Sequence, residues 1–356
     1  MLELKRTMVS MVVSMVVLMM AVAVFTSLAG AASTGILAPG AKWEEISHIG
    51  LASSEGVVAD RNGMVYASDL SRAPVDKGYY PCGTIWRYDP RTGIIDKFMQ
   101  PSGVANGLHF DRNGDMIIAQ SSGVFCAERR VIRRSMRTGA IAVVADSYQG
   151  KRLIGTNDVT SDVAGRIYFT DARYTDKGPI ELPNAIYRVD PDGKITQIST
   201  DIYRPNGIEV SPDGKRLYVA ATNNPGLEKN PNGPEKDAFG ITGGGVVMYD
   251  LDSSGNISNG RLIYRDDTIF GDSMAMDTDG NLYVTMHNSN PGDPKGYVVV
   301  LDPEGRVIEK ITVPERSLPT NLGFGRGTDD NSLYLTNLGQ WRLWRIQTVR
   351  LGLYRD

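Results

Sequence analysis

A polar residue returns six times at the same point of a repeated pattern, and this recurrence constrains the fold more than any other feature. The six positions, called the polar markers below, are Glu55, Asn106, Asn157, Asn206, Asp272 and Asn321. Each polar marker opens a short apolar run that ends in a turn, and a β-rich run such as RIYFTD or NLYVTMH follows the turn. Two such runs around a tight turn predict a β-hairpin.

Every repeat continues with another alternating run, such as AIYRVDP or VVVLDP, and the first five repeats add a fourth apolar segment. The steps between successive polar markers are 51, 51, 49, 66 and 49 residues. A period in this range with four strands per repeat is typical of a β-propeller. We therefore predict an all-β six-bladed β-propeller over residues 43–348, with four antiparallel strands per blade.

The sixth repeat has no evident fourth strand after RLWRIQ. The segment KWEEISHI, residues 43–50, can supply that strand and close the ring. The C-terminal LGLYRD is a competing candidate for the same edge. The sequence leaves both alternatives open.

The first residues differ in kind from the repeats. Lys5 and Arg6 precede an apolar stretch from Met8 to Leu28, and small residues follow. This pattern predicts a secretory signal peptide over residues 1–31. An uncleaved anchor is the alternative, because about 20 apolar residues suffice to span a bilayer. In both cases we expect an exported propeller, periplasmic or secreted, which touches a membrane only through this segment if it is retained.

Composition limits the partners. The net charge is −3, and Lys and Arg are scattered among carboxylates. We expect no nucleic-acid partner, because a basic stripe for phosphate backbones is missing from the sequence. Cys82 and Cys126 fall in corresponding loops of neighbouring repeats, so an oxidising compartment would allow a disulfide between them. Two free thiols are the alternative.

In a propeller the innermost strands begin at one end of the central channel, so the polar markers should form a ring there. Two carboxylates balance the charge of a divalent cation, and amide oxygens add ligands without excess charge. We expect one divalent cation. An all-oxygen ligand set favours Ca²⁺, although Mg²⁺, Mn²⁺ and Zn²⁺ stay open.

Four runs around the polar markers carry a family resemblance: SSEGVVAD, GTNDVTSDVAGRIYFTD, RPNGIEVSPDGKRLYVAAT and GDSMAMDTDGNLYVT. They resemble the gluconolactonase and regucalcin (senescence-marker protein) family of calcium-dependent six-bladed propellers, which includes drug-responsive lactonases. Diisopropyl fluorophosphatase and paraoxonase are more remotely similar. The resemblance covers residues 43–346 and implies a catalytic metal held by Glu55, Asn157, Asn206 and Asp272.

The chain departs from the family pattern at two motifs. Glu55-Gly56-Val57 stands where the family has Glu-Gly-Pro, and Gly271-Asp272-Ser273 stands where it has Pro-Asp-Gly. The Asp-Ser variant is closer to the drug-responsive lactonases than to regucalcin, and Ser273 is an additional candidate ligand. These departures leave the metal ligands intact and affect the expected substrate.

A cation with open positions would polarise a lactone carbonyl and support attack by water. We therefore expect a gluconolactonase-like hydrolase that opens a lactone ring. Other esters or phosphotriesters are alternative substrates for the same site. A non-catalytic binding propeller with a structural metal is the alternative from another class.

Further residues are assigned to this site. Asp272 and Asp158 are the candidate general bases. Asn106, Asn321, His287 and Ser273 are expected to contact substrate, whereas His109 is expected to pack in the core. The 66-residue step holds a Gly-, Pro- and Asn-rich insertion at residues 223–245, for which we hypothesise a role as a partial lid.

Overall fold

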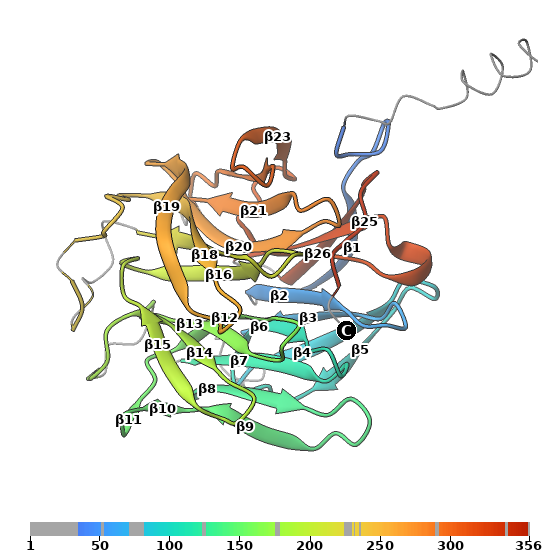
Figure 1. The fold of residues 1–356 in the computed structure, drawn as a ribbon. Coiled ribbons are helices and arrows are strands. Elements are labelled where there is room, and N and C mark those ends of the chain that lie inside the picture. Colours follow the sequence, from blue (N-terminus) through green and yellow to red (C-terminus); the bar gives the residue numbers. More distant parts are fainter. Residues whose placement is uncertain are drawn as a thin grey trace, which may run out of the picture.

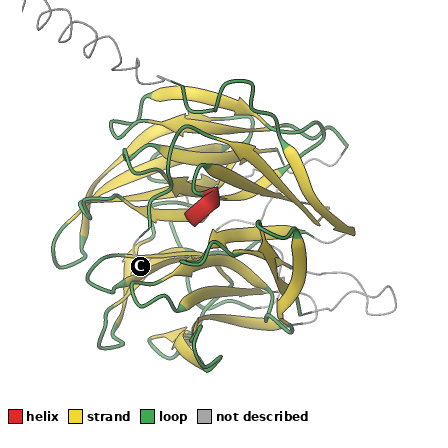
Figure 2. Cartoon of the chain, turned by 90° about the vertical axis from the view of Figure 1, so that its right-hand side faces the viewer, coloured by secondary structure: helices red, strands yellow, loops and turns green. Residues whose placement is uncertain are grey.

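The computed structural model describes residues 35–50, 53–70, 82–122, 126–174, 179–223, 230, 232–234, 236–288, 292–338 and 341–354. This part of the chain is built of strands and loops, with one short 3-10 turn, η2 (Gly327–Asp329) (Figure 2). The predicted signal peptide, residues 1–31, lies outside the described residues. Where the chain is described, it contains no helix with the length and apolar character needed to cross a bilayer.

The strands form six four-stranded antiparallel sheets, which confirms the predicted six-bladed propeller. The strands of each blade are given from the channel outward. The first blade consists of β2 (Ser54–Ala59), β3 (Val65–Asp69), β4 (Thr84–Asp89) and β5 (Ile94–Met99), and the second of β6 (Ala105–Phe110), β7 (Met116–Ser122), β8 (Ala127–Arg134) and β9 (Ile141–Ala145). The third blade consists of β12 (Thr156–Ser161), β13 (Ile167–Asp171), β14 (Ala185–Val189) and β15 (Ile195–Ser199). A small ribbon of β10 (Ser147–Tyr148) and β11 (Lys151–Arg152) separates the second and third blades.

The fourth blade consists of β16 (Pro205–Val210), β17 (Arg216–Thr222), β18 (Gly244–Leu251) and β19 (Ile257–Asp266), and the fifth of β20 (Phe270–Met276), β21 (Leu282–His287), β22 (Gly296–Leu301) and β23 (Val307–Thr312). The sixth blade consists of β24 (Pro319–Phe324), β25 (Ser332–Asn337), β26 (Trp341–Gln347) and β1 (Glu44–Gly50). Each innermost strand contacts the innermost strands of the two neighbouring blades. Figure 1 shows inner strands such as β2, β6 and β16 in the middle of the molecule and outer strands such as β9, β19 and β23 at its edge.

In four of the six blades an aspartate directly follows the inner strand and stabilises the tight turn. In the first blade, Asp60 Oδ1 accepts hydrogen bonds from the backbone N–H groups of Asn62 and Met64, at 2.8 and 3.0 Å. Asp60 Oδ2 accepts a third bond from the Tyr66 hydroxyl at 3.0 Å. In the third blade, Asp162 Oδ2 accepts the corresponding hydrogen bond from the Tyr168 hydroxyl. The side chain thus satisfies turn donors and ties the turn to the second strand.

The N-terminal segment of residues 43–50, and not the C-terminal tail, completes the sixth blade. β1 pairs antiparallel with β26, with Glu44 opposite Arg345 and Gly50 opposite Trp341. The C-terminal segment instead bonds to the fifth blade, where Leu353 N donates to Met276 O at 2.8 Å. Leu353 and Tyr354 therefore lie at the end of the channel opposite the polar markers, against residues of the inner strands.

Two loop predictions have outcomes in the described residues. Cys82 and Cys126 form a disulfide between the loops of the first and second blades. In the 223–245 insertion, Asn230 Oδ1 accepts a hydrogen bond from Asn184 N, and Asp237 Oδ2 accepts one from Tyr203 N. These contacts fasten the described part of the insertion to the third and fourth blades, and the lid role stays a prediction.

Candidate active site

All six polar markers sit near the start of an innermost strand and inside an irregularity of strand pairing. In β2 the regular register is interrupted between Ser54 and Val57, which flank Glu55. The corresponding interruption brackets the polar marker in β6, β12, β16, β20 and β24. Such bulges re-aim a side chain out of the regular alternation. The markers are buried, with exposed fractions from 3% for Asn206 to 8% for Glu55, Asn157 and Asp272.

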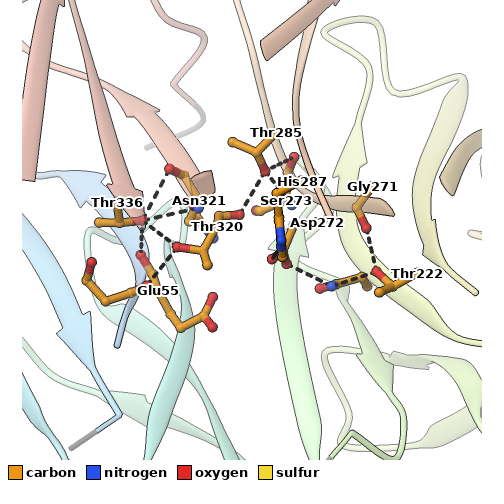
Figure 3. A network of polar contacts seen from close by, with 12 residues as sticks. Glu55, Thr222, Gly271, Asp272, Ser273, Thr285, His287, Thr320, Asn321 and Thr336 are labelled. Atoms are coloured by element: carbon orange, nitrogen blue, oxygen red, sulfur yellow. Dashed lines mark hydrogen bonds and ion pairs between the residues drawn. The ribbon is translucent and has the colours of Figure 1, made fainter. Parts of the chain in front are cut away.

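Asn206 and Asp272 meet directly across the boundary between the fourth and fifth blades. Asn206 Nδ2 donates to Asp272 Oδ1 at 2.7 Å, and His287 Nε2 lies 2.8 Å from Asp272 Oδ2. Figure 3 shows His287 and Asp272 together on one side of this polar network. His287 therefore lies against the Asp272 carboxylate, and its predicted contact with substrate stays a prediction.

Hydroxyl groups at the ends of second strands hold the backbone of the polar markers in the next blade. Thr336 Oγ1 donates to Glu55 O at 2.6 Å, Ser68 Oγ to Asn106 O at 2.7 Å, and Thr170 Oγ1 to Asn206 O at 2.7 Å. Thr336, Thr320 and Asn321 gather beside Glu55 in Figure 3. The backbones of three markers, Glu55, Asn106 and Asn206, are therefore positioned by a hydroxyl group of the neighbouring blade.

Asp158 lies in the channel wall next to Asn157. Its carboxylate accepts hydrogen bonds from Ser273 Oγ at 2.8 Å and from Val159 N at 2.9 Å. Burial raises the pKa of Asp158 to about 7, against the lowering effect of the Ser273 hydrogen bond. Asp158 is also among the residues that line the central cavity.

The channel beyond the ring is narrow. A cavity of about 90 Å³ is lined by residues from all six inner strands, and Tyr354 lies at its far end. His109 belongs to this lining and contacts Ser161 Oγ through Nε2 at 2.9 Å. The expectation of a core histidine is therefore wrong, because the inner-strand position of His109 faces the channel rather than the packing between blades.

One buried oxygen in the ring suits a cation. Among the described residues, Asn206 Oδ1 is a buried acceptor with no hydrogen-bond partner. A buried acceptor left without a partner costs about 1–3 kcal/mol. A hard divalent cation would satisfy Asn206 Oδ1, and the carboxylates of Glu55 and Asp272 would supply its counter-charge. The donor set fits such an ion.

Charged and sulfur ligands alone do not form a metal site among the described residues. Within the described part of the chain, no three His, Cys, Asp or Glu side chains form a group suited to a metal ion. The two carboxylates of the ring are accompanied by the amides of the other polar markers, among which Asn157 is the further predicted ligand. Asn106 and Asn321 occupy the remaining inner strands, as expected for residues that complete the ring.

Three residues of this site escaped the sequence analysis. Thr222 Oγ1 accepts a hydrogen bond from Asn206 Nδ2 at 3.0 Å and donates to Gly271 O. Arg204 is 1% exposed, although an arginine in a loop ordinarily predicts a solvated side chain. Tyr174 donates to Pro205 O at 3.1 Å, next to Asn206. A single sequence carries no signal for these contacts, because they join strand ends that are 16 or more residues apart in sequence.

Comparisons with known proteins agree with this architecture. Residues 85–231 and 240–339 match the model of the SMP-30/Gluconolactonase/LRE-like region. A gluconolactonase of Zymomonas mobilis is 28% identical over 272 residues, which are 69% of this chain and 68% of that protein. A pentonolactonase, XacC, of Haloferax volcanii is 25% identical over 72% of this chain and 75% of its own.

A solved structure extends the similarity to the fold. The gluconolactonase XC5397 of Xanthomonas campestris superimposes with a TM-score of 0.68 at 21% identity, over 89% of this chain and 92% of that one. At this identity the likeness concerns the fold alone. The family model, by contrast, matches well over half of the chain, and therefore the protein belongs to the SMP-30/gluconolactonase/LRE-like family.

Proposed function

We propose that the protein is a lactonase that opens a sugar lactone by hydrolysis with one divalent cation, Ca²⁺, in the ring of polar markers. The observation that carries the proposal is the buried Asn206 Oδ1, which lacks a donor beside the Asp272 carboxylate. Family membership and relatives named gluconolactonase and pentonolactonase support the reaction class.

Glu55, Asn157, Asn206 and Asp272 would hold the cation. When bound, a divalent cation supplies Lewis acidity that polarises a carbonyl and makes water a stronger nucleophile at neutral pH. Two of these side chains are held in place by hydrogen bonds without the cation: Asn206 bonds to Thr222, and Asp272 bonds to Asn206 and His287. Such fixed partners orient ligands and raise affinity.

The remaining residues have distinct roles in this proposal. Asp272 is needed for the cation, so Asp158 takes the proton from water, and Ser273 holds the Asp158 carboxylate in place. Ser273 contacts Asp158, and the additional ligand role considered from the sequence stays a prediction. Asn106 and Asn321 line the ring and orient substrate oxygens. The product is the open-chain hydroxy acid.

We also propose that the protein is exported. The basic and apolar character of residues 1–31 motivates this assignment, and the Cys82–Cys126 disulfide supports it, since disulfides persist in oxidising compartments. Mass spectrometry of the mature protein from the periplasm or medium would test both cleavage and compartment. An intact N-terminus in a cytoplasmic fraction would contradict the assignment.

The decisive experiment is ring opening of a lactone panel in a pH-stat, with added Ca²⁺ and after treatment with a chelator. Activity should require the cation, and Glu55→Gln and Asp272→Asn should abolish both binding of the cation and activity, because each removes a ligand charge. Asp96→Asn, which breaks an exposed ion pair with Arg87 on the outer strand β5, is the matched control. Full metal content and full activity in both ring variants would refute the proposed site.

A further inference from the structure

The hydroxyl of Tyr174 lies at the boundary between the third and fourth blades, beside the ring. Tyr174 follows β13 of the third blade and is half-buried. Its hydroxyl donates to Pro205 O, the carbonyl of the residue directly before Asn206, at 3.1 Å. The phenol is therefore anchored to the backbone that carries one of the proposed ligands.

The electrostatic environment places the Tyr174 hydroxyl within the field of the ring. Burial raises the pKa of Tyr174, and Arg204 opposes this rise. The negative charges of Asp272 and Glu55 raise the pKa further, although these residues belong to the fifth and first blades. The hydrogen bond to Pro205 O, directly before Asn206, is the contact that places the phenol beside the ring to which these carboxylates belong.

Arg204 fixes the position of Tyr174. Its Nε donates to Arg173 O at 2.9 Å, and its Nη1 lies 3.3 Å from Thr222 O. The guanidinium carbon is 5.7 Å from the centre of the Tyr174 ring. The buried Arg204 side chain thus connects Arg173, the residue before Tyr174, with Thr222 at the end of β17. The same residue Thr222 supports the Asn206 amide, so Tyr174 and the ring share one support.

We propose that Tyr174, positioned by Arg204, accepts a hydrogen bond from a hydroxyl group of the substrate and so selects hydroxylated lactones over unsubstituted ones. This inference rests on the lactonase function proposed above. The phenolic proton is committed to Pro205 O, and the proton of the nearby Thr222 hydroxyl is committed to Gly271 O, which leaves the lone pairs of the phenol oxygen as acceptors. The substrate must bring the donor. A site built to bond a substrate hydroxyl discriminates against the analogue that lacks it, because its own polar group is then left unpaired.

Tyr174→Phe tests the inference, because it keeps the ring and removes the oxygen. The measurement is the ratio of kcat/KM for D-glucono-δ-lactone to kcat/KM for δ-valerolactone in the Ca²⁺-loaded enzyme. Loss of one such hydrogen bond should lower the ratio about tenfold, mainly through kcat/KM for the sugar lactone. Tyr187→Phe, in β14 of the same blade, removes a hydroxyl that receives a bond from Gln197 and should leave the ratio unchanged.

Two outcomes would overturn the inference: an unchanged ratio in Tyr174→Phe, or an equal fall for both lactones, which would mark a merely structural role. Arg204→Lys keeps a charge but loses the forked donor, so it should lower the ratio in the same direction. An Arg204→Lys ratio equal to that of the wild type would refute the positioning role.

A binding measurement separates this inference from the lactonase proposal. The probe is 1,5-anhydro-D-glucitol, which keeps the hydroxylated ring without a carbonyl, titrated calorimetrically into the Ca²⁺-loaded protein. A wild-type protein that opens no lactone refutes the proposed function. Binding of the probe by the wild type and its loss in Tyr174→Phe would still support hydroxyl recognition, whereas equal binding by both proteins would overturn it.

Discussion

Ser273 donates a hydrogen bond to Asp158 across 2.8 Å, and this contact joins the fifth blade to the third. The fourth blade lies between them in the ring. Both residues directly follow a predicted metal ligand, at a position that glycine occupies after Glu55, Asn106 and Asn206. A side chain at Gly107 or Gly207 would clash with Asp158 or with the Asp272–Ser273 backbone, respectively. The chain therefore reserves the space at the channel centre for one carboxylate and one hydroxyl.

The contact between Asp158 and Ser273 predicts separable effects. Asp158→Asn should lower kcat by about a hundredfold or more, the usual contribution of a proton-transferring group, while Ca²⁺ affinity stays within about threefold. Ser273→Ala should lower the unfolding free energy by about 1–3 kcal/mol, because it leaves the buried carboxylate short of a donor. Kinetics, calorimetry of Ca²⁺ binding and urea unfolding measure the three quantities. An Asp158→Asn enzyme with wild-type kcat would remove Asp158 from the mechanism.

The pairing of His287 with Asp272 predicts a different signature. His287→Ala should weaken Ca²⁺ binding about 10–100-fold, the range for residues that orient a metal ligand, because Asp272 loses one of its two supports. His109→Ala, in the cavity beyond the ring, serves as the control and should leave Ca²⁺ affinity unchanged. Equal affinities of the wild type and His287→Ala would show that Asn206 alone suffices to orient Asp272.

The disulfide predicts a stability effect without an effect on the site. Cys82 and Cys126 are 44 residues apart in sequence. Opening a loop of this length should cost about 4 kcal/mol of unfolding free energy through the entropy of the unfolded chain. The double variant Cys82→Ser/Cys126→Ser should therefore unfold at lower urea concentration, and adding a reductant should lower the wild type to the same midpoint. A wild-type midpoint that is insensitive to reductant would contradict this prediction.

Asp171 predicts how stability depends on pH. The side chain is fully buried at the end of β13, where it accepts hydrogen bonds from Ile154 N and Gly155 N just before Asn157. Burial raises the pKa of Asp171 to about 6, against the lowering effect of these bonds. The native state therefore favours the protonated form. This contribution to stability is full below the unfolded-state pKa and is lost as pH rises through about 6.

Asp171→Asn removes this titration and keeps an acceptor oxygen. The unfolding free energy of the wild type relative to the Asn variant should fall by on the order of 2 kcal/mol between about pH 4 and about pH 8. Urea unfolding at several pH values measures it, and Asp96→Asn on the exposed edge of β5 should show no such trend. A relative stability that rises with pH would reverse the sign and refute the argument.

The sequence predicts the blades well because each blade is a local pattern. Hairpin turns, alternating runs and the repeat length are all visible within one repeat, and the six polar markers keep their register. The choice between residues 43–50 and the C-terminal tail was undecidable at that level. Pairing partners about 300 residues apart decide it, since Arg345 bonds to Glu44 at 2.6 Å.

The site was predicted only in part, for a related reason. Its residues were found by recurrence, but their contacts join blades that are distant in sequence. The bulges that re-aim the markers, the burial of Arg204 and the approach of Ser273 to Asp158 depend on how inner strands pack around the channel. His109 was assigned to the core because strand alternation alone does not tell which face of an inner strand borders the channel.

The closure of the sixth blade joins two distant parts of the chain. β1 is the first strand of the described residues, and its partner β26 is the last one. A chain cut short before residues 341–347 would therefore leave β1 without its pairing partner and the sixth blade without its two outer strands. The propeller has no edge that can be trimmed on that side without opening a blade.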